Sequence, residues 1–113
     1  MTKISDMFAK REYKAAVQSG LCCVEVSGEA CAGCAALLPV LRPLAEKFGM
    51  TFVHAEVSLM EESLLSEWKI DRVPTVLLLD GGEIFARCAG FQPEEILEIW
   101  MEAKLEERGA GKR

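Results

Sequence analysis

The sequence predicts an α/β sandwich whose central sheet contains strands of mixed direction. Short apolar runs alternate along the chain with stretches in which apolar residues recur at helical spacing, a pattern typical of α/β proteins. The turn sequence Asp80-Gly81-Gly82 joins two of the apolar runs closely enough to pair them antiparallel. With 113 residues the chain has the length of one domain, and we expect residues 1–108 to form it.

The first predicted helix and the first predicted core strand follow one another directly. Residues 7–18 form the helix after the capping residues Ser5 and Asp6, and a very short strand around Lys3 precedes it. Residues 21–26 are short and apolar and lie between two glycines. This combination favours a buried parallel strand over a helix.

A long helix and a second core strand come next. Leucines recur at helical spacing through residues 31–48, and Gly49 supplies the stop. Pro39 and Pro43 lie inside this helix. Residues 50–57 alternate in part between apolar and polar side chains and predict a strand.

The second half of the chain contains a helix, a hairpin and a terminal helix. Ser58 and Glu61 have the spacing of a capping box, which predicts a helix over residues 59–69. Residues 73–79 form a strand that pairs with residues 83–89 across the glycine turn. The last helix opens at Gln92-Pro93-Glu94-Glu95 and runs to about Glu107, and residues 109–113 form a flexible tail.

Charge and hydropathy argue against two kinds of partner. Lys and Arg number 13 and Asp and Glu 18, a net charge of −5, so no basic face for nucleic acid is expected. No apolar run approaches the roughly 18 to 20 residues of a membrane span. Residues 1–14 mix charged with apolar side chains and contain no apolar region for export. We therefore expect a soluble, cytoplasmic protein with no membrane partner.

The candidate chemistry lies in the sequence Cys31-Ala32-Gly33-Cys34, where a strand passes into a helix. The free N–H groups and partial positive charge of a helix N-terminus stabilise a thiolate, which makes Cys31 the nucleophile. Cys34 lies one turn further along, where it can attack a mixed disulfide formed at Cys31. The spacing therefore predicts a pair of redox-active thiols.

The remaining cysteines have simpler interpretations. A C-x-x-C pair alone is also half of a zinc site, and the five cysteines are an odd number, unlike a secreted disulfide framework. Cys22 and Cys23 are interpreted as core residues that face opposite ways and do not bridge each other. Cys88 is interpreted as a bystander, or as an exposed thiol open to glutathionylation or dimer formation. His54 is interpreted as a structural residue.

Together, the C-x-x-C, Pro39 in the helix that follows it, and Val73-Pro74-Thr75 about forty residues on resemble thioredoxin. The resemblance covers nearly the whole chain. It implies a thioredoxin-like fold, a three-layer α/β/α sandwich around a central mixed sheet of four or five strands. The protein is therefore identified as a member of the thioredoxin family.

The resemblance assigns roles to several residues. Pro74 matches the family's cis-proline, which packs against the dithiol and exposes the backbone of Val73 to an extended substrate. Gly90 matches a glycine that flanks the substrate groove. Glu25 matches the family's buried Asp, which takes the proton of the resolving thiol, and Pro39 matches the helix-kinking proline.

The chain also departs from the family pattern around the dithiol. Ala-Gly stands between the cysteines in place of Gly-Pro, and Ala30 replaces the tryptophan before the nucleophile. Ser27 stands where another aromatic residue is usual, and His54 occupies the place of the lysine that pairs with the buried acid. Pro43 adds a second proline to the helix.

The function predicted from these observations is thiol–disulfide oxidoreduction on protein disulfides by Cys31, Cys34 and Glu25, in a monomer. No cofactor or metal is required in the chain, and the resemblance implies electrons from a separate reductase that uses a flavin and NADPH. Two alternatives remain open. One is a redox-inactive or weakly active module that binds a partner peptide by strand addition. The other is zinc or cluster binding by Cys31 and Cys34 with a partner's ligands.

Overall fold

A mixed β-sheet forms the centre of the protein. The computed structural model describes residues 20–109, so the predicted helix over residues 7–18 and the short strand around Lys3 lie outside the described residues. In chain order the described elements are β1 (Leu21–Ser27), α3 (Ala32–Lys47), β2 (Thr51–Glu56), the 3₁₀ turn η1 (Val57–Leu59), α4 (Glu62–Glu67), β3 (Thr75–Asp80), β4 (Glu83–Ala89) and α5 (Glu94–Arg108).

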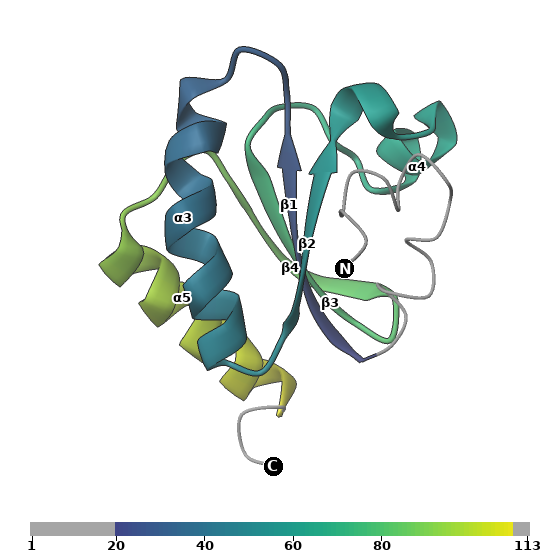
Figure 1. Ribbon diagram of the computed structural model, residues 1–113. Helices are drawn as coiled ribbons and strands as arrows, with labels where there is room; N and C mark the ends of the chain where they lie inside the picture. Colours follow the sequence, from purple (N-terminus) through teal and green to yellow (C-terminus); the bar gives the residue numbers. More distant parts are fainter. Residues whose placement is uncertain (1–19, 110–113) are drawn as a thin grey trace.

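The four described strands lie in the order β2-β1-β3-β4. β1 is parallel to β2 and antiparallel to β3, and β3 is antiparallel to β4. Figure 1 shows α3 and α5 on one face of this sheet and α4 on the other. The structure therefore confirms the predicted sandwich with mixed strand directions and the three-layer thioredoxin-like fold. In the part of the chain that the structure describes, no helix has the length and apolar character to cross a bilayer.

β1 is an inner strand of the described sheet, and its two faces contribute to two separate cores. Alternate side chains of a strand point to opposite faces, so Cys22 packs with α4 and Cys23 packs with α3 and α5. Both cysteines are fully buried and unpaired. The prediction that they face opposite ways and act as core residues is confirmed.

α3 is the helix that begins at the C-x-x-C, and it packs on one face of the sheet. Its buried side chains recur at helical spacing and pack on the sheet: Cys34, Leu37, Leu41, Leu44 and Ala45. Pro39 and Pro43 lie inside the helix as predicted, and both are exposed. A proline lacks the N–H for the bond to the residue four before it, so exposure lets water satisfy the carbonyls that are left without a partner.

The predicted third helix is wrong at its N-terminal end. The chain forms η1 and then turns at Met60, and α4 begins only at Glu62, after the cap residue Glu61. Ser58 lies within η1 and Glu61 is itself the residue before α4, so these two residues do not begin the helix as the predicted capping box. Met60 is buried with an extended backbone, which a continuous helix cannot provide.

Two other boundaries also differ from their predictions. β3 begins at Thr75 and not at residue 73, because Pro74 has no N–H for the sheet. α5 begins after the cap residue Pro93 and ends at Gly109, whose φ of +86° closes the helix. Gly109, predicted as part of a tail, is thus the helix cap, and residues 110–113 lie outside the described residues.

Candidate functional site

The two cysteines of the C-x-x-C lie at the N-terminus of α3, as the sequence predicts. Cys31 is the cap residue of the helix and Cys34 lies in its first turn. Their sulfurs are joined as a disulfide, with the Cα atoms 5.2 Å apart. Cys31 is partly exposed and Cys34 is buried, so an incoming group reaches Cys31 first.

The helix N-terminus provides a favourable environment for negative charge on Cys31. The backbone N–H of Cys34 donates to Cys31 Sγ at 3.1 Å, in the way that a capping oxygen accepts such a bond. The first turn of α3 contains no acidic side chain to oppose the peptide dipoles. This geometry favours a thiolate at Cys31 once the disulfide is reduced.

Glu25 is the fully buried carboxyl group that the resemblance implies. It lies on the face of β1 that packs under α3, and its exposed fraction is zero. Burial raises its pKa from the usual 4.5 to about 7, although a hydrogen bond from Ser27 acts in the opposite direction. A carboxyl group with this pKa can exchange a proton near neutral pH.

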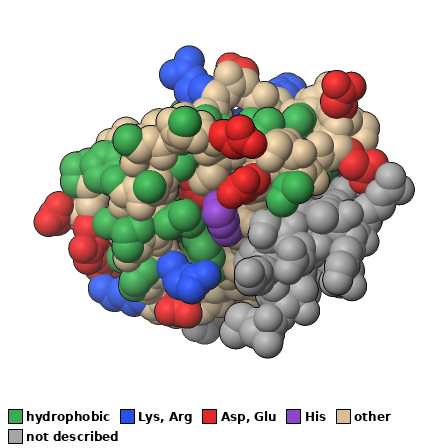
Figure 2. Space-filling view, turned by 45° about the horizontal axis from the view of Figure 1, so that its top comes forward, with side chains coloured by type: hydrophobic (Ala, Val, Ile, Leu, Met, Phe, Trp, Pro, Cys, Tyr) green, Lys and Arg blue, Asp and Glu red, His purple; other side chains and the backbone are tan. Residues whose placement is uncertain are grey.

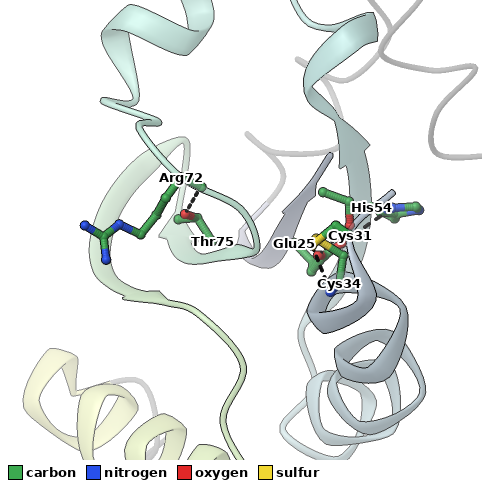
Figure 3. Close-up of a disulfide and its surroundings, with 7 residues drawn as sticks. Glu25, Cys31, Cys34, His54, Arg72 and Thr75 are labelled. Carbon is green, nitrogen blue, oxygen red and sulfur yellow. Dashed lines mark hydrogen bonds and ion pairs between the residues drawn. A yellow bond between two sulfur atoms is a disulfide. The ribbon is translucent and has the colours of Figure 1, made fainter. Parts of the chain in front are cut away.

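Ser27 and His54 are the polar partners of Glu25. The hydroxyl of Ser27 lies 2.6 and 2.7 Å from the two carboxyl oxygens and donates to them. His54 is the residue of β2 that pairs with Glu25 in the sheet, and its Nε2 lies 3.5 Å from Glu25 Oε1. Figure 3 shows Glu25, His54 and both cysteines grouped at the start of α3.

Sequence reasoning interpreted His54 as structural and gave Ser27 no role. A simple signal was available for Ser27. Ser27 is two residues beyond Glu25 on a strand, so it shares the face of Glu25. For His54, the resemblance gave the position of a residue that pairs with the buried acid, but the contact itself depends on the register between β1 and β2, which no local pattern contains.

The loop before β3 lies beside the dithiol. The Val73–Pro74 peptide bond is cis, as the resemblance implies. A Cβ atom placed on Gly33 would lie 3.7 Å from Pro74 Cδ and 3.8 Å from Phe91 Cβ. The N–H of Gly90 donates to the carbonyl of Pro74 at 2.8 Å. The fold thus brings Val73, Pro74 and Gly90 together next to the C-x-x-C.

Two hollows border the site. One, of about 630 Å³, is lined by the chain from Ser27 to Ala32 together with Cys34, Ala35, Leu38, His54 and Glu56. The other, of about 400 Å³, is mostly apolar and lies beside Val73, Val57, Leu65 and Ile70. The small side chains of Ala30 and Ser27 line the first hollow together with both cysteines of the dithiol.

The other thiols lie away from this chemistry. Burial raises the pKa of Cys22 to about 12 and also raises the pKa values of Cys23 and Cys88. All three are therefore weak nucleophiles near neutral pH. Within residues 20–109, no three His, Cys, Asp or Glu side chains are grouped so as to hold a metal ion.

The mixed sheet, the dithiol at a strand-to-helix junction and the adjacent cis-proline define a thioredoxin-like protein. The chain matches the family Thioredoxin over residues 5–103, and it belongs to the thioredoxin family. It is 28% identical to a thioredoxin H-type of Ricinus communis over 78 residues, which are 68% of this chain and 65% of that protein. The matched region thus spans just under two thirds of the length of that relative.

The fold is similar to a solved thioredoxin structure. A mutant thioredoxin from Halobacterium salinarum NRC-1 superposes with a TM-score of 0.73 at 24% sequence identity, and the match covers 83% of each chain. At this identity the likeness supports the fold.

Proposed function

We propose that this protein is a thiol–disulfide oxidoreductase that reduces disulfides in protein substrates. The observation that carries the proposal is the position of Cys31, partly exposed and capping α3, with Cys34 buried one turn away. The membership in the thioredoxin family supports it. Three cysteines stay unpaired, which suits a reducing compartment such as the cytoplasm.

The reaction proceeds in two exchanges. The Cys31 thiolate attacks one sulfur of the substrate disulfide, that S–S bond breaks, and the other substrate sulfur leaves as a thiolate. Cys34 then attacks Cys31 Sγ and releases the second substrate sulfur. Glu25 takes the proton of Cys34 as general base. The substrate gains two electrons, and the protein ends with the Cys31–Cys34 disulfide.

The remaining proposed site residues hold the substrate. Val73 offers its backbone at the edge of the site, where an extended peptide can pair in the manner of an added strand. Pro74 lies beside Gly33 of the C-x-x-C and accepts a hydrogen bond from the N–H of Gly90. These two residues form a wall beside the dithiol. A separate reductase, of the flavin and NADPH type that the resemblance implies, returns electrons to the protein disulfide.

Insulin reduction with dithiothreitol tests the proposal. Cys31→Ser is expected to lower the rate to that of the reagent alone, because the serine hydroxyl does not ionise near neutral pH. Cys34→Ser is expected to accumulate a mixed disulfide with the substrate, visible on a non-reducing gel, because no thiol resolves it. Cys88→Ser serves as the control and is expected to keep the parent rate.

Two outcomes would contradict the proposal. One is a Cys31→Ser variant as active as the parent. The other is a parent protein that binds a reduced or oxidised peptide tightly but does not accelerate insulin reduction, with a Cys31–Cys34 potential outside roughly −300 to −200 mV. The second result would instead support a peptide-binding module.

A further inference from the structure

Glu25 has no direct route for its proton to reach water. Its exposed fraction is zero, so any proton that it exchanges with solvent must pass through a neighbouring group. Its two polar neighbours among the described residues are Ser27 and His54. Both line the 630 Å³ hollow that contains Cys31 and Cys34, so either could connect Glu25 with solvent.

Ser27 is suited to the ionised form of Glu25. Its hydroxyl lies within 2.7 Å of both oxygens and has one proton to donate, which stabilises a carboxylate. A serine hydroxyl does not hold an additional proton near neutral pH. Ser27 therefore orients Glu25 and does not carry its proton away.

His54 has the geometry that a carrier of this proton needs. Its Nε2 is buried and, within the described chain, has no hydrogen-bond partner, although it lies only 3.5 Å from Glu25 Oε1. The side chain is 23% exposed, and because Nε2 is covered, this exposure belongs to its other atoms. One side of the ring thus faces the buried acid, and another reaches the surface.

We propose that His54 is the relay through which Glu25 releases its proton to solvent, a role that rests on the proposed function. When Glu25 is protonated, its O–H donates to Nε2. The O–H bond then breaks, an N–H bond forms on Nε2, and a carboxylate and an imidazolium result. The imidazolium passes the proton on its exposed side to water or buffer and returns to the neutral form. No electrons move in these steps.

The groups around His54 permit this cycle. Burial lowers the pKa of His54, Arg42 from α3 acts in the same direction, and Glu56 on its own strand acts in the opposite one. Glu29, from the loop after β1, lines the same hollow. Since burial raises the pKa of Glu25, the proton resides mainly on the carboxyl group, and the imidazole is a transient carrier. In Figure 2 the histidine, in purple, reaches the surface between acidic and basic side chains.

The test follows the proton directly on the oxidised protein, so it does not depend on reductase activity. A pH jump from 6 to 8 is followed by infrared spectroscopy of the protonated carboxyl band, which Glu25→Gln identifies by removing it. We expect His54→Gln and His54→Ala to slow the loss of this band by about tenfold or more, because no relay group remains.

Imidazole as an added reagent distinguishes a relay from a structural role. His54→Ala enlarges an existing hollow of about 280 Å³ beside Leu38, Pro39 and Arg42, which gives an imidazole ring access. Imidazole is expected to restore the rate of His54→Ala and to leave the parent unchanged. Leu38→Ala is the matched control, since it opens the same hollow but keeps the relay, and no dependence on imidazole is expected.

Two results would overturn the proposal. The first is a His54→Gln variant that loses its proton at the parent rate, because a side chain that does not titrate would then suffice. The second is a His54→Ala rate that imidazole does not change. Neither result would affect the insulin assay of the parent, so failure of this inference is distinguishable from failure of the proposed function.

Discussion

At the scale of single residues, the burial of Glu25 favours its role as a base but lowers the stability of the fold. A carboxyl group with zero exposure loses its hydration, and the hydrogen bond from Ser27 restores only part of it. Its pKa of about 7 in the folded protein lies above the 4.5 of an unburied glutamate. The folded protein therefore keeps this proton over a pH interval in which the unfolded chain has released it.

This difference predicts the pH dependence of stability. The contribution of Glu25 is constant below about pH 4.5, falls as pH rises from about 4.5 to 7, and is constant above that. The fall amounts to roughly 3 kcal/mol. Glu25→Gln should abolish it, because the amide oxygen still accepts from Ser27 but does not ionise.

Urea unfolding of the oxidised proteins between pH 4.5 and 8 measures this effect. We expect the two proteins to have similar free energies of unfolding at pH 4.5 and the variant to be the more stable at pH 8. Equal pH dependence in both proteins would show that Glu25 has an ordinary pKa. The signal for Glu25 was present in the sequence, because a lone acid in an apolar strand is costly unless it is used.

At the scale of elements, the loop between β1 and α3 contains a strained residue. Ala30 has a φ of +51°, in the left-handed region where a Cβ atom is unfavourable. It immediately precedes Cys31, and the strain is a cost of turning the chain from the strand into the helix cap. The sequence showed a missing tryptophan here but did not indicate the backbone conformation.

Ala30→Gly is expected to stabilise the protein by up to about 1 kcal/mol, because glycine adopts this conformation without strain. Ala36→Gly is the matched control, since Ala36 is exposed inside α3 and should lose roughly 1 kcal/mol through helix propensity. Urea unfolding at one pH compares the two variants. A loss of stability in both would show that Ala30 is unstrained.

The wrong prediction for the start of α4 also concerns a single element. The S-x-x-E spacing of Ser58 and Glu61 is a local signal for a helix start. The chain instead buries Met60 against the core on the α4 face of the sheet, and this packing requires an extended residue between η1 and α4. The burial of one large side chain outweighed a capping preference, whose worth is about 1 kcal/mol.

At the scale of the whole molecule, the site depends on two segments that are distant in the sequence. Gly28, at the end of β1, approaches Val73, before the cis-proline, so closely that a Cβ on Gly28 would lie 2.9 Å from Val73 Cγ2. The two segments meet at the 400 Å³ hollow, and Gly28 also lines the 630 Å³ hollow that contains the dithiol. A glycine is needed here for the close approach.

Gly28→Ala is therefore expected to destabilise the protein by roughly 1–3 kcal/mol, the usual cost of overpacking. It should also lower the rate of insulin reduction, since it displaces the Val73 backbone. Adding Val73→Ala removes the atom that clashes, so the double variant should regain part of the lost stability relative to Val73→Ala alone. Strictly additive losses in this double-mutant cycle would show that the two residues do not interact.

The sequence by itself determined the α/β class, the thiols at a strand-to-helix junction, the buried acid and the glycine hairpin. Each of these depends on side chains close together in the chain, where periodicity and turn chemistry act locally. The resemblance to thioredoxin implied that His54 lies beside Glu25 and that Pro74 lies against the C-x-x-C, although no local pattern showed either contact. Only the tertiary structure showed that Gly28 meets Val73. These contacts depend on strand register and on packing between residues that are as far apart in the sequence as Gly28 and Val73, and a local pattern does not encode them.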